Sequence, residues 1–240
     1  MTDAELSRIV RTSIDAWTER LWQQSNLARV TRQGALSQRA LALYLESLRF
    51  LFHHSHLHLI AAQQRAETLG DAALATVFRD KAAEERGHDQ WAMRDLSGLS
   101  EQSVRGVEPA VSSRRLVEFQ RELITQRHPL CFFSYALWAE YLTVRLGDVW
   151  LGALACNGYA RSAVSAVANH VEADREHAAA AFGMLDELWR GQPEKSLILR
   201  TVEEAQQHFE AFCEEIYLAG HSGALEQHEA CSHVGQARST

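Results

Sequence analysis

Apolar residues recur at every third or fourth position along most of this chain, and this spacing constrains the fold more than any other feature. It places apolar side chains on one face of a helix, and three prolines in 240 residues leave the helices few interruptions. The alternation of period two that is typical of strands does not persist anywhere. The sequence therefore predicts an all-α protein.

Capping and turn residues divide the periodic stretches into separate helices. Thr2 and Glu5 form a capping-box pattern ahead of the first helix, and Ser37 and Asp71 can cap the second and third. Residues 97–112, with two glycines and a proline, are expected to form the longest interior loop. The first expected helix ends at about residue 24. The other six span about 37–70, 71–96, 112–128, 132–147, 161–189 and 196–218, and a short apolar segment lies at 149–155.

The charge balance argues against several classes of partner. With a formal net charge of -7 at pH 7, the chain has no basic excess to neutralise nucleic acid or an anionic membrane. No apolar run approaches the roughly 18 residues that span a bilayer. The N-terminus lacks the features of a signal peptide, and the four cysteines are scattered. We expect a cytoplasmic protein with reduced thiols.

A carboxylate and an imidazole stand three residues apart in the third expected helix. Glu85 and His88 would share one helical face at this spacing. Inward-facing Glu-x-x-His pairs build di-iron carboxylate sites in helical bundles. Exposed helices also contain this spacing by chance, so a solvated pair is the alternative interpretation.

The sixth expected helix carries a longer motif. His170, Asp174 and His177 occupy positions i, i+4 and i+7, which lie on one stripe of a helix. Two histidines and one carboxylate are the ligand set of non-haem iron oxygenases, which leave positions open for O2 and substrate. Acid–base pairing on the surface is the alternative.

One carboxylate stands alone in the almost wholly apolar fifth helix. Burying Glu140 would cost on the order of several kcal/mol unless it is paired or bound to a metal. Arg145 is the only nearby cation in sequence and lies off the face of Glu140. Metal ligation and a salt bridge to a distant arginine are both open.

These motifs combine into three carboxylates and three imidazoles. Such a set suits two Fe(II) ions, with carboxylates able to bridge them. Mixed ligands disfavour structural zinc, which usually takes thiolates, and magnesium or calcium, which prefer oxygen. The predicted catalytic and metal-binding residues are Glu85, His88, Glu140, His170, Asp174 and His177.

The three motifs, in this order over about residues 35–215, resemble those of the haem-oxygenase-like di-iron oxidases and oxygenases. That family includes alkene-forming fatty-acid decarboxylases, N-oxygenases and an amino-acid-fragmenting lyase. The resemblance implies a seven-helix haem-oxygenase-like (TenA-like) bundle, two Fe(II) ions and O2 as co-substrate. It also implies oxidation of a small organic molecule, with N-oxygenation of an amine or amino-acid-like compound slightly preferred over oxidative C–C cleavage.

Two positions in the resemblance need comment. Some family members place the first glutamate seven residues before the histidine, where this chain has Lys81. That favours Glu85 as the first carboxylate ligand, with Glu84 as an alternative. Rival functions are a metal-free enzyme of the thiamin-degrading kind, for which Cys131 would be the nucleophile, a cofactor-free oxidase, and a non-enzymatic scaffold. Haem oxygenase itself is disfavoured, because no histidine precedes His53.

The remaining histidines are grouped in two places. The run from His53 to His58 has two open roles, in a substrate pocket or as packing and solvated positions. The cluster of His221, His228, Cys231 and His233 resembles a metal site only loosely. We expect one domain over 1–220, a flexible tail over 221–240, and either a monomer or a homodimer.

Overall fold

Helices joined by turns and loops make up the described part of the protein, which contains no strand, as the spacing of its apolar residues predicts. The computed structural model describes residues 5–189 and 192–236, with the side chains of residues 6–189 and 192–220. The elements in chain order are α1 (Glu5–Gln24), α2 (Asn26–Arg32), α3 (Gln38–Thr68), α4 (Ala72–Glu84), α5 (Asp89–Ser97), α6 (Glu101–Val104), α7 (Val111–Thr125), α8 (Pro129–Cys156), the 3-10 helix η1 (Arg161–Ala163), α9 (Ser165–Leu188) and α10 (Lys195–Gln236).

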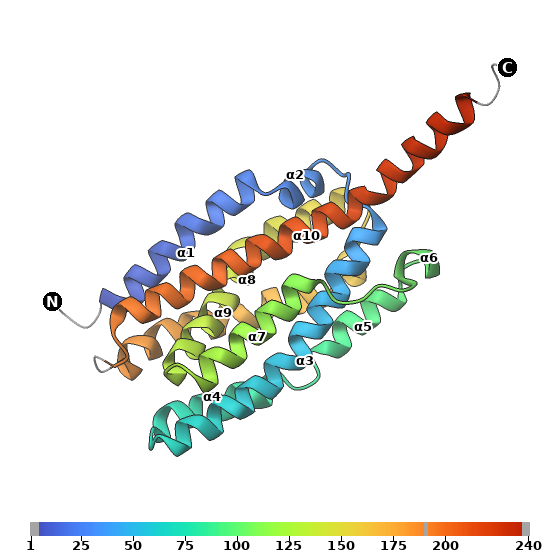
Figure 1. The fold of residues 1–240 in the computed structure, drawn as a ribbon. Helices are drawn as coiled ribbons and strands as arrows, with labels where there is room; N and C mark the ends of the chain where they lie inside the picture. Colours follow the sequence, from blue (N-terminus) through green and yellow to red (C-terminus); the bar gives the residue numbers. More distant parts are fainter. Residues whose placement is uncertain (1–4, 190–191, 237–240) are drawn as a thin grey trace.

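The long helices lie side by side in one bundle (Figure 1). α3 packs against α4, α5 and α7, whereas α8 packs against α9 and α10. α10 joins these two groups because it contacts α3, α7 and α8. The space in which α3, α4, α8 and α9 face one another is where the candidate site lies.

Large aromatic side chains fill the interior between these helices. Trp17, Phe78, Phe133, Trp138 and Phe212 are almost completely buried. Burying a large apolar side chain contributes about 1.5–3 kcal/mol to stability, so this core fixes the helices around the polar site.

Caps predicted from the sequence begin two of the helices. The side chain of Ser37 accepts a hydrogen bond from the backbone N–H of Ala40, and Asp71 accepts one from the N–H of Leu74. Each bond satisfies a backbone N–H group in the first turn of its helix that has no partner within the helix, as predicted. Thr2, in the predicted capping box, lies outside the described residues.

The expected single helix over 71–96 is wrong. It is broken between Glu84 and Asp89, where Gly87 adopts a φ of 87°. Residues other than glycine rarely adopt this left-handed backbone conformation. Gly87 therefore allows the chain to leave α4 and turn into α5.

The expected end of a helix at Gly147 is also wrong. α8 continues to Cys156 and includes the apolar segment 149–155. A Cβ atom at Gly147 would lie 2.1 Å from Cγ2 of Val171 on α9. The glycine therefore permits close packing of α8 against α9 and does not terminate the helix.

Other boundaries add elements to the expected seven. The first helical stretch bends at Ser25 into α1 and α2, and the expected loop at 97–112 contains the short α6. α10 extends to Gln236, but the side chains from 221 onward, including the predicted His and Cys cluster, lie outside the described ones. The flexible tail stays a prediction.

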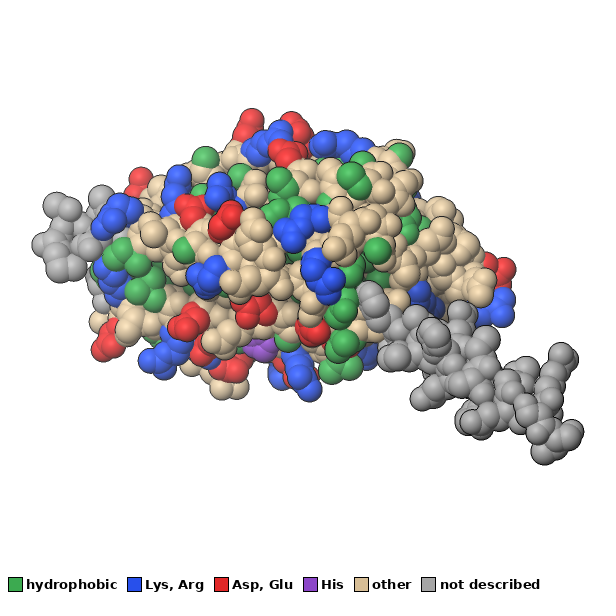
Figure 2. Space-filling model, turned by 90° about the horizontal axis from the view of Figure 1, so that it is seen from above, with side chains coloured by type: hydrophobic (Ala, Val, Ile, Leu, Met, Phe, Trp, Pro, Cys, Tyr) green, Lys and Arg blue, Asp and Glu red, His purple; other side chains and the backbone are tan. Residues whose placement is uncertain are grey.

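On the face of the molecule shown in Figure 2, Lys and Arg side chains are interspersed with Asp and Glu side chains, and no large patch of one charge is visible. Among the described helices, none combines the length and the apolarity needed to cross a bilayer.

Candidate metal centre

The break between α4 and α5 carries the first pair of predicted ligands. Glu85 is the last residue of the α4 turn and His88 directly precedes α5. Oε2 of Glu85 lies 3.3 Å from Nδ1 of His88. The two side chains do meet as expected, but the turn at Gly87 brings them together rather than one regular helical face.

His170 approaches this pair from α9. Its Nδ1–H donates to the backbone carbonyl of Ala166 at 2.9 Å, which leaves the lone pair of Nε2 free. Phe52 stacks on the His170 ring at 4.1 Å, and Trp91 stacks on the His88 ring at 4.0 Å. Hydrogen bonding and stacking thus fix the orientation of both imidazoles before any ion binds.

Glu85, His88 and His170 form a group suited to one metal ion. One ligand atom from each lies within 4.8 Å of the others, and donors on opposite sides of one bound ion are about 4 Å apart. Among the described side chains, this is the one group of three His, Cys, Asp or Glu residues that lie so close together. The buried Nδ1 of His88 has no hydrogen-bond partner. We call these three residues the metal triad.

The charge states of the metal triad suit ligation. Burial raises the pKa of Glu85, but His88, His170 and Lys81 together outweigh this and hold it below its usual value. Burial lowers the pKa of His170. A charged carboxylate and a neutral imidazole are the forms that bind metal ions, and these two directions favour them.

Glu140 lies deep in the same region. Its partner is a lysine, which is neither of the two alternatives considered from the sequence, a metal ion and an arginine. Lys81, from α4, donates a hydrogen bond to Oε1 of Glu140, whereas Arg145 pairs with Asp15 at 2.8 Å. Oε2 of Glu140 is buried and unpartnered. Burial raises the pKa of Glu140 in spite of the lysine.

Asp174 faces the same space from α9. It is buried, and burial together with the neighbouring Glu140 and Glu85 raises its pKa to about 8. Its carboxyl group is therefore mostly protonated at neutral pH in the metal-free protein. This group holds a proton within reach of the metal triad.

His177 completes the predicted set but lies at its outer edge. Its side chain is 30% exposed, with Nε2 3.7 Å from Glu84 and Nδ1 3.9 Å from Asp174. The predicted residues of α9 thus divide, with His170 in the metal triad and His177 outside it.

A pocket connects most of these groups, and we call it the polar pocket. It is bounded by α3, α4, α8 and α9. Its polar and charged lining residues are Ser55, Lys81, Glu84, Glu85, Tyr135, Glu140, Thr143, His170 and Asp174.

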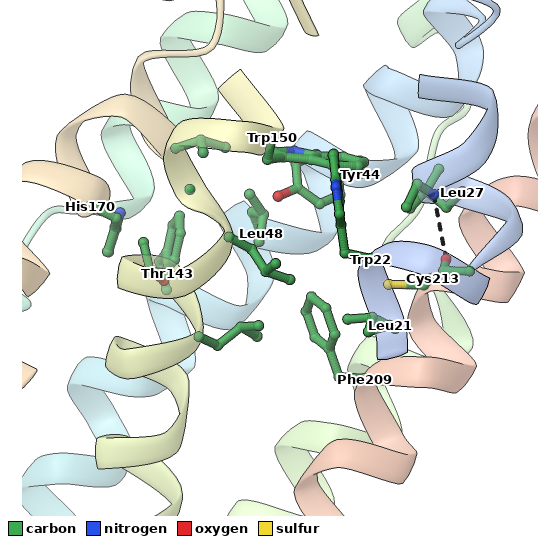
Figure 3. A pocket seen from close by; sticks show the side chains of 17 residues that line it. Leu21, Trp22, Leu27, Tyr44, Leu48, Thr143, Trp150, His170, Phe209 and Cys213 are labelled. Atoms are coloured by element: carbon green, nitrogen blue, oxygen red, sulfur yellow. Dashed lines mark hydrogen bonds between the residues drawn. The ribbon is translucent and has the colours of Figure 1, made fainter. Parts of the chain in front are cut away.

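A second hollow, the apolar cavity, adjoins the polar pocket (Figure 3). It holds about 800 Å³ of space, including open solvent at its mouth. It shares Phe52, Thr143 and His170 with the polar pocket. In Figure 3, His170 and Thr143 lie at one side and Cys213 at the other. Its remaining labelled lining residues are Leu21, Trp22, Leu27, Tyr44, Leu48, Trp150 and Phe209.

Sequence reasoning missed both the apolar cavity and the role of Lys81. Each cavity residue looks like ordinary core in its own helix, so no local pattern could mark it. For Lys81 a signal existed, since it stands between the apolar Phe78 and Ala82 on a helix face that is otherwise buried.

The histidine run on α3 serves mainly as structural anchoring. The Nδ1–H of His56 donates to the carbonyl of Ala82 at 2.8 Å, and that of His58 donates to Oε1 of Gln120 at 2.7 Å. His53 is exposed near Asp89. The first bond ties α3 to the last turn of α4, directly beside the metal triad.

The fold and the site together define a haem-oxygenase-like helical bundle with a candidate metal centre. A structure of a domain of unknown function with a haem-oxygenase-like fold from Shewanella denitrificans superposes with a TM-score of 0.76 and 17% identity, over 90% of this chain and 92% of that one. A TenA homologue from Pseudomonas syringae gives 0.70 and 12%, over 87% and 91%. Neither protein-family profiles nor curated sequences give a match.

Proposed function

We propose that this protein is a non-haem iron enzyme that uses O2 to oxidise a small organic molecule. The observation that carries the proposal is the metal triad, two imidazoles and one carboxylate, of which His170 also lines a mainly apolar cavity. This ligand set is typical of iron oxygenases, because it leaves coordination positions open.

The residues present fit an iron ion. His88 offers a buried Nδ1 that lies 3.3 Å from Oε2 of Glu85, His170 offers Nε2 in a fixed ring, and the pKa of Glu85 is held below its usual value. Iron bound there would supply the reduction of O2, which no side chain can carry out.

The chain's own residues would orient the substrate and exclude water. Trp22, Tyr44 and Trp150 form an aromatic wall of the apolar cavity, away from His170. A substrate with an alkyl or aryl portion against this wall would present its reacting atom at the shared boundary of the two hollows. Protonated Asp174 can give up a proton there.

The lining of the apolar cavity indicates which class of substrate the site would bind. Its lining is dominated by aromatic and aliphatic side chains, which favour an apolar portion over the charged groups of a free amino acid. N-oxygenation of an apolar amine fits this lining. Oxidative C–C cleavage of an aliphatic acid fits it equally and is the second candidate.

The metal-free alternative that uses Cys131 has weaker support. The Cys131 side chain is 0% exposed, and burial raises the pKa of its thiol. A nucleophilic cysteine needs the thiolate form and access to substrate.

Anaerobic loading with Fe(II), followed by exposure to O2 with panels of alkyl amines and aliphatic acids, tests the proposal. We expect O2 consumption that depends on both iron and substrate and is abolished in His170→Ala. Failure of the wild-type protein to bind iron would contradict the proposal and favour a scaffold. O2 consumption that His170→Ala leaves unchanged would contradict it too.

A further inference from the structure

Lysine is rare in this protein, and one of the two lysines is inside the site. Of the 24 basic residues, only Lys81 and Lys195 are lysines and the rest are arginines. Lys195 is a half-buried residue at the start of α10, whereas Lys81 is 7% exposed and lines the polar pocket. Lysine is almost never buried without a partner, so its placement here has a specific function.

The ammonium of Lys81 stands among three carboxylates. It donates to Oε1 of Glu140, and its charge acts on Asp174 and on Glu85 as well. These carboxylates belong to the α4–α5 turn, α8 and α9, so the cation interacts with three of the segments that build the site.

We propose that the ammonium of Lys81 takes the place of a second metal ion, so that the site binds a single iron at Glu85, His88 and His170. This inference rests on the proposed function and differs from the two ions implied by the sequence resemblance.

Among the described side chains, Glu140, Asp174 and His177 do not form a second group of ligand atoms as close as the metal triad. Glu140 is bound to Lys81, and the nitrogens of His177 lie 3.7 Å from Glu84 and 3.9 Å from Asp174. A metal ion beside Glu140 would also meet the lysine's positive charge within a few ångströms, in a medium that screens charge poorly.

Size and charge explain why lysine suits this role. An ammonium is a compact point charge on a flexible stem, whereas a guanidinium is a wide planar fork that needs more room.

Metal counting tests the inference. After anaerobic loading with excess Fe(II) and desalting, we expect one iron per chain in the wild type and two in Lys81→Glu, which removes the cation and adds a carboxylate. Lys195→Glu is the matched control and should keep one. Circular dichroism of each variant checks that it is folded. Two irons in the wild type, or one in folded Lys81→Glu, would overturn the inference.

If Lys81→Glu does not fold, Glu140→Gln provides a second test of the inference. If Glu140 binds only the lysine, the glutamine variant should retain one iron per chain with an affinity within about threefold of the wild type. A loss of iron in this variant would show that Glu140 is a ligand and overturn the inference.

The same assays separate this inference from the proposed function. One iron without substrate-dependent O2 use would contradict the proposed function and support the role of Lys81. Two irons per chain with substrate-dependent O2 use would support the proposed function and contradict the role of Lys81. A wild type that binds no iron would contradict both.

Discussion

The polar pocket and the apolar cavity share a wall but are built in different ways. The polar pocket depends on the turn at Gly87 and on buried charges that compensate one another, such as Lys81 and Glu140. The apolar cavity depends on the packing of aromatic side chains from α1–α2, α3, α8 and α10.

The difference teaches that chemistry and recognition are separable in this fold. Changes in the polar pocket should alter metal binding and respond to pH. Changes in the apolar cavity should alter ligand size and stability and leave the metal in place. His170, which lines both, is the exception and provides the severest test.

Removal of the shared imidazole should have the largest effect. In His170→Ala we expect iron affinity to fall by at least about 100-fold, because even the hydrogen-bond partners of metal ligands are worth about 10–100-fold. Iron content after desalting and O2 consumption are the measurements. His58→Ala, which removes another buried histidine, should keep its iron, and equal loss in both variants would contradict the assignment.

Filling the apolar cavity should impair recognition alone. Leu48→Trp places a larger ring among the cavity residues, and we expect an apolar fluorescent ligand to bind about tenfold more weakly, or about 1.4 kcal/mol. Iron content should not change. A parallel loss of iron would mean that the two regions are not separable.

The two regions should differ in how their stability depends on pH. In the folded metal-free protein the pKa of Asp174 is about 8, against 3.8 ordinarily. The folded state therefore holds a proton that the unfolded state releases, and this contribution to stability is lost as pH rises through that range.

Denaturation of metal-free protein at pH 5 and pH 8 measures this difference. Relative to the wild type, Asp174→Asn should gain up to about 4 kcal/mol between the two values, since each pKa unit corresponds to about 1.4 kcal/mol. Leu142→Ala, in the apolar cavity, should cost about 2–5 kcal/mol equally at both. Parallel behaviour of the two variants would contradict the contrast.

A pair of glycines on α8 gives the smallest and most local test. Gly147→Ala should destabilise the protein by about 1–3 kcal/mol, because its Cβ would overlap Val171. Gly152→Ala meets nothing within 4 Å and should stabilise the helix by about 0.5–1 kcal/mol. Urea denaturation compares them, and equal effects would show that α8 and α9 are not so closely packed.

The fold was largely predictable because its signals are local. Ser37 and Asp71 cap helices by contacts with residues three positions away, which a sequence displays directly. Gly87 and Gly147 were harder, since one breaks a helix and the other packs within one. Only the presence of Val171 on another helix distinguishes them.

The site was predictable in its residue types and less so in its arrangement. Helical spacing predicted that Glu85 lies beside His88, and the two do meet, but through the turn at Gly87. It also predicted that His170 lies on an inward face, and His170 is buried. The partner of Glu140 is Lys81, which is 59 positions away, and no local rule connects the two. The separation of His177 from the metal triad likewise depends on how α9 is rotated against α4.

The position of His170 in both hollows has a thermodynamic consequence. A ligand in the apolar cavity that shifts the ring by a fraction of an ångström changes iron affinity by some factor, and linkage requires that iron change the affinity for that ligand by the same factor. Binding of iron and of such a ligand would therefore be cooperative, and Phe52, which stacks on the imidazole and lines both hollows, is one contact through which a ligand could shift the ring. Titrations of the apolar ligand with and without iron would measure that cooperativity as a single number.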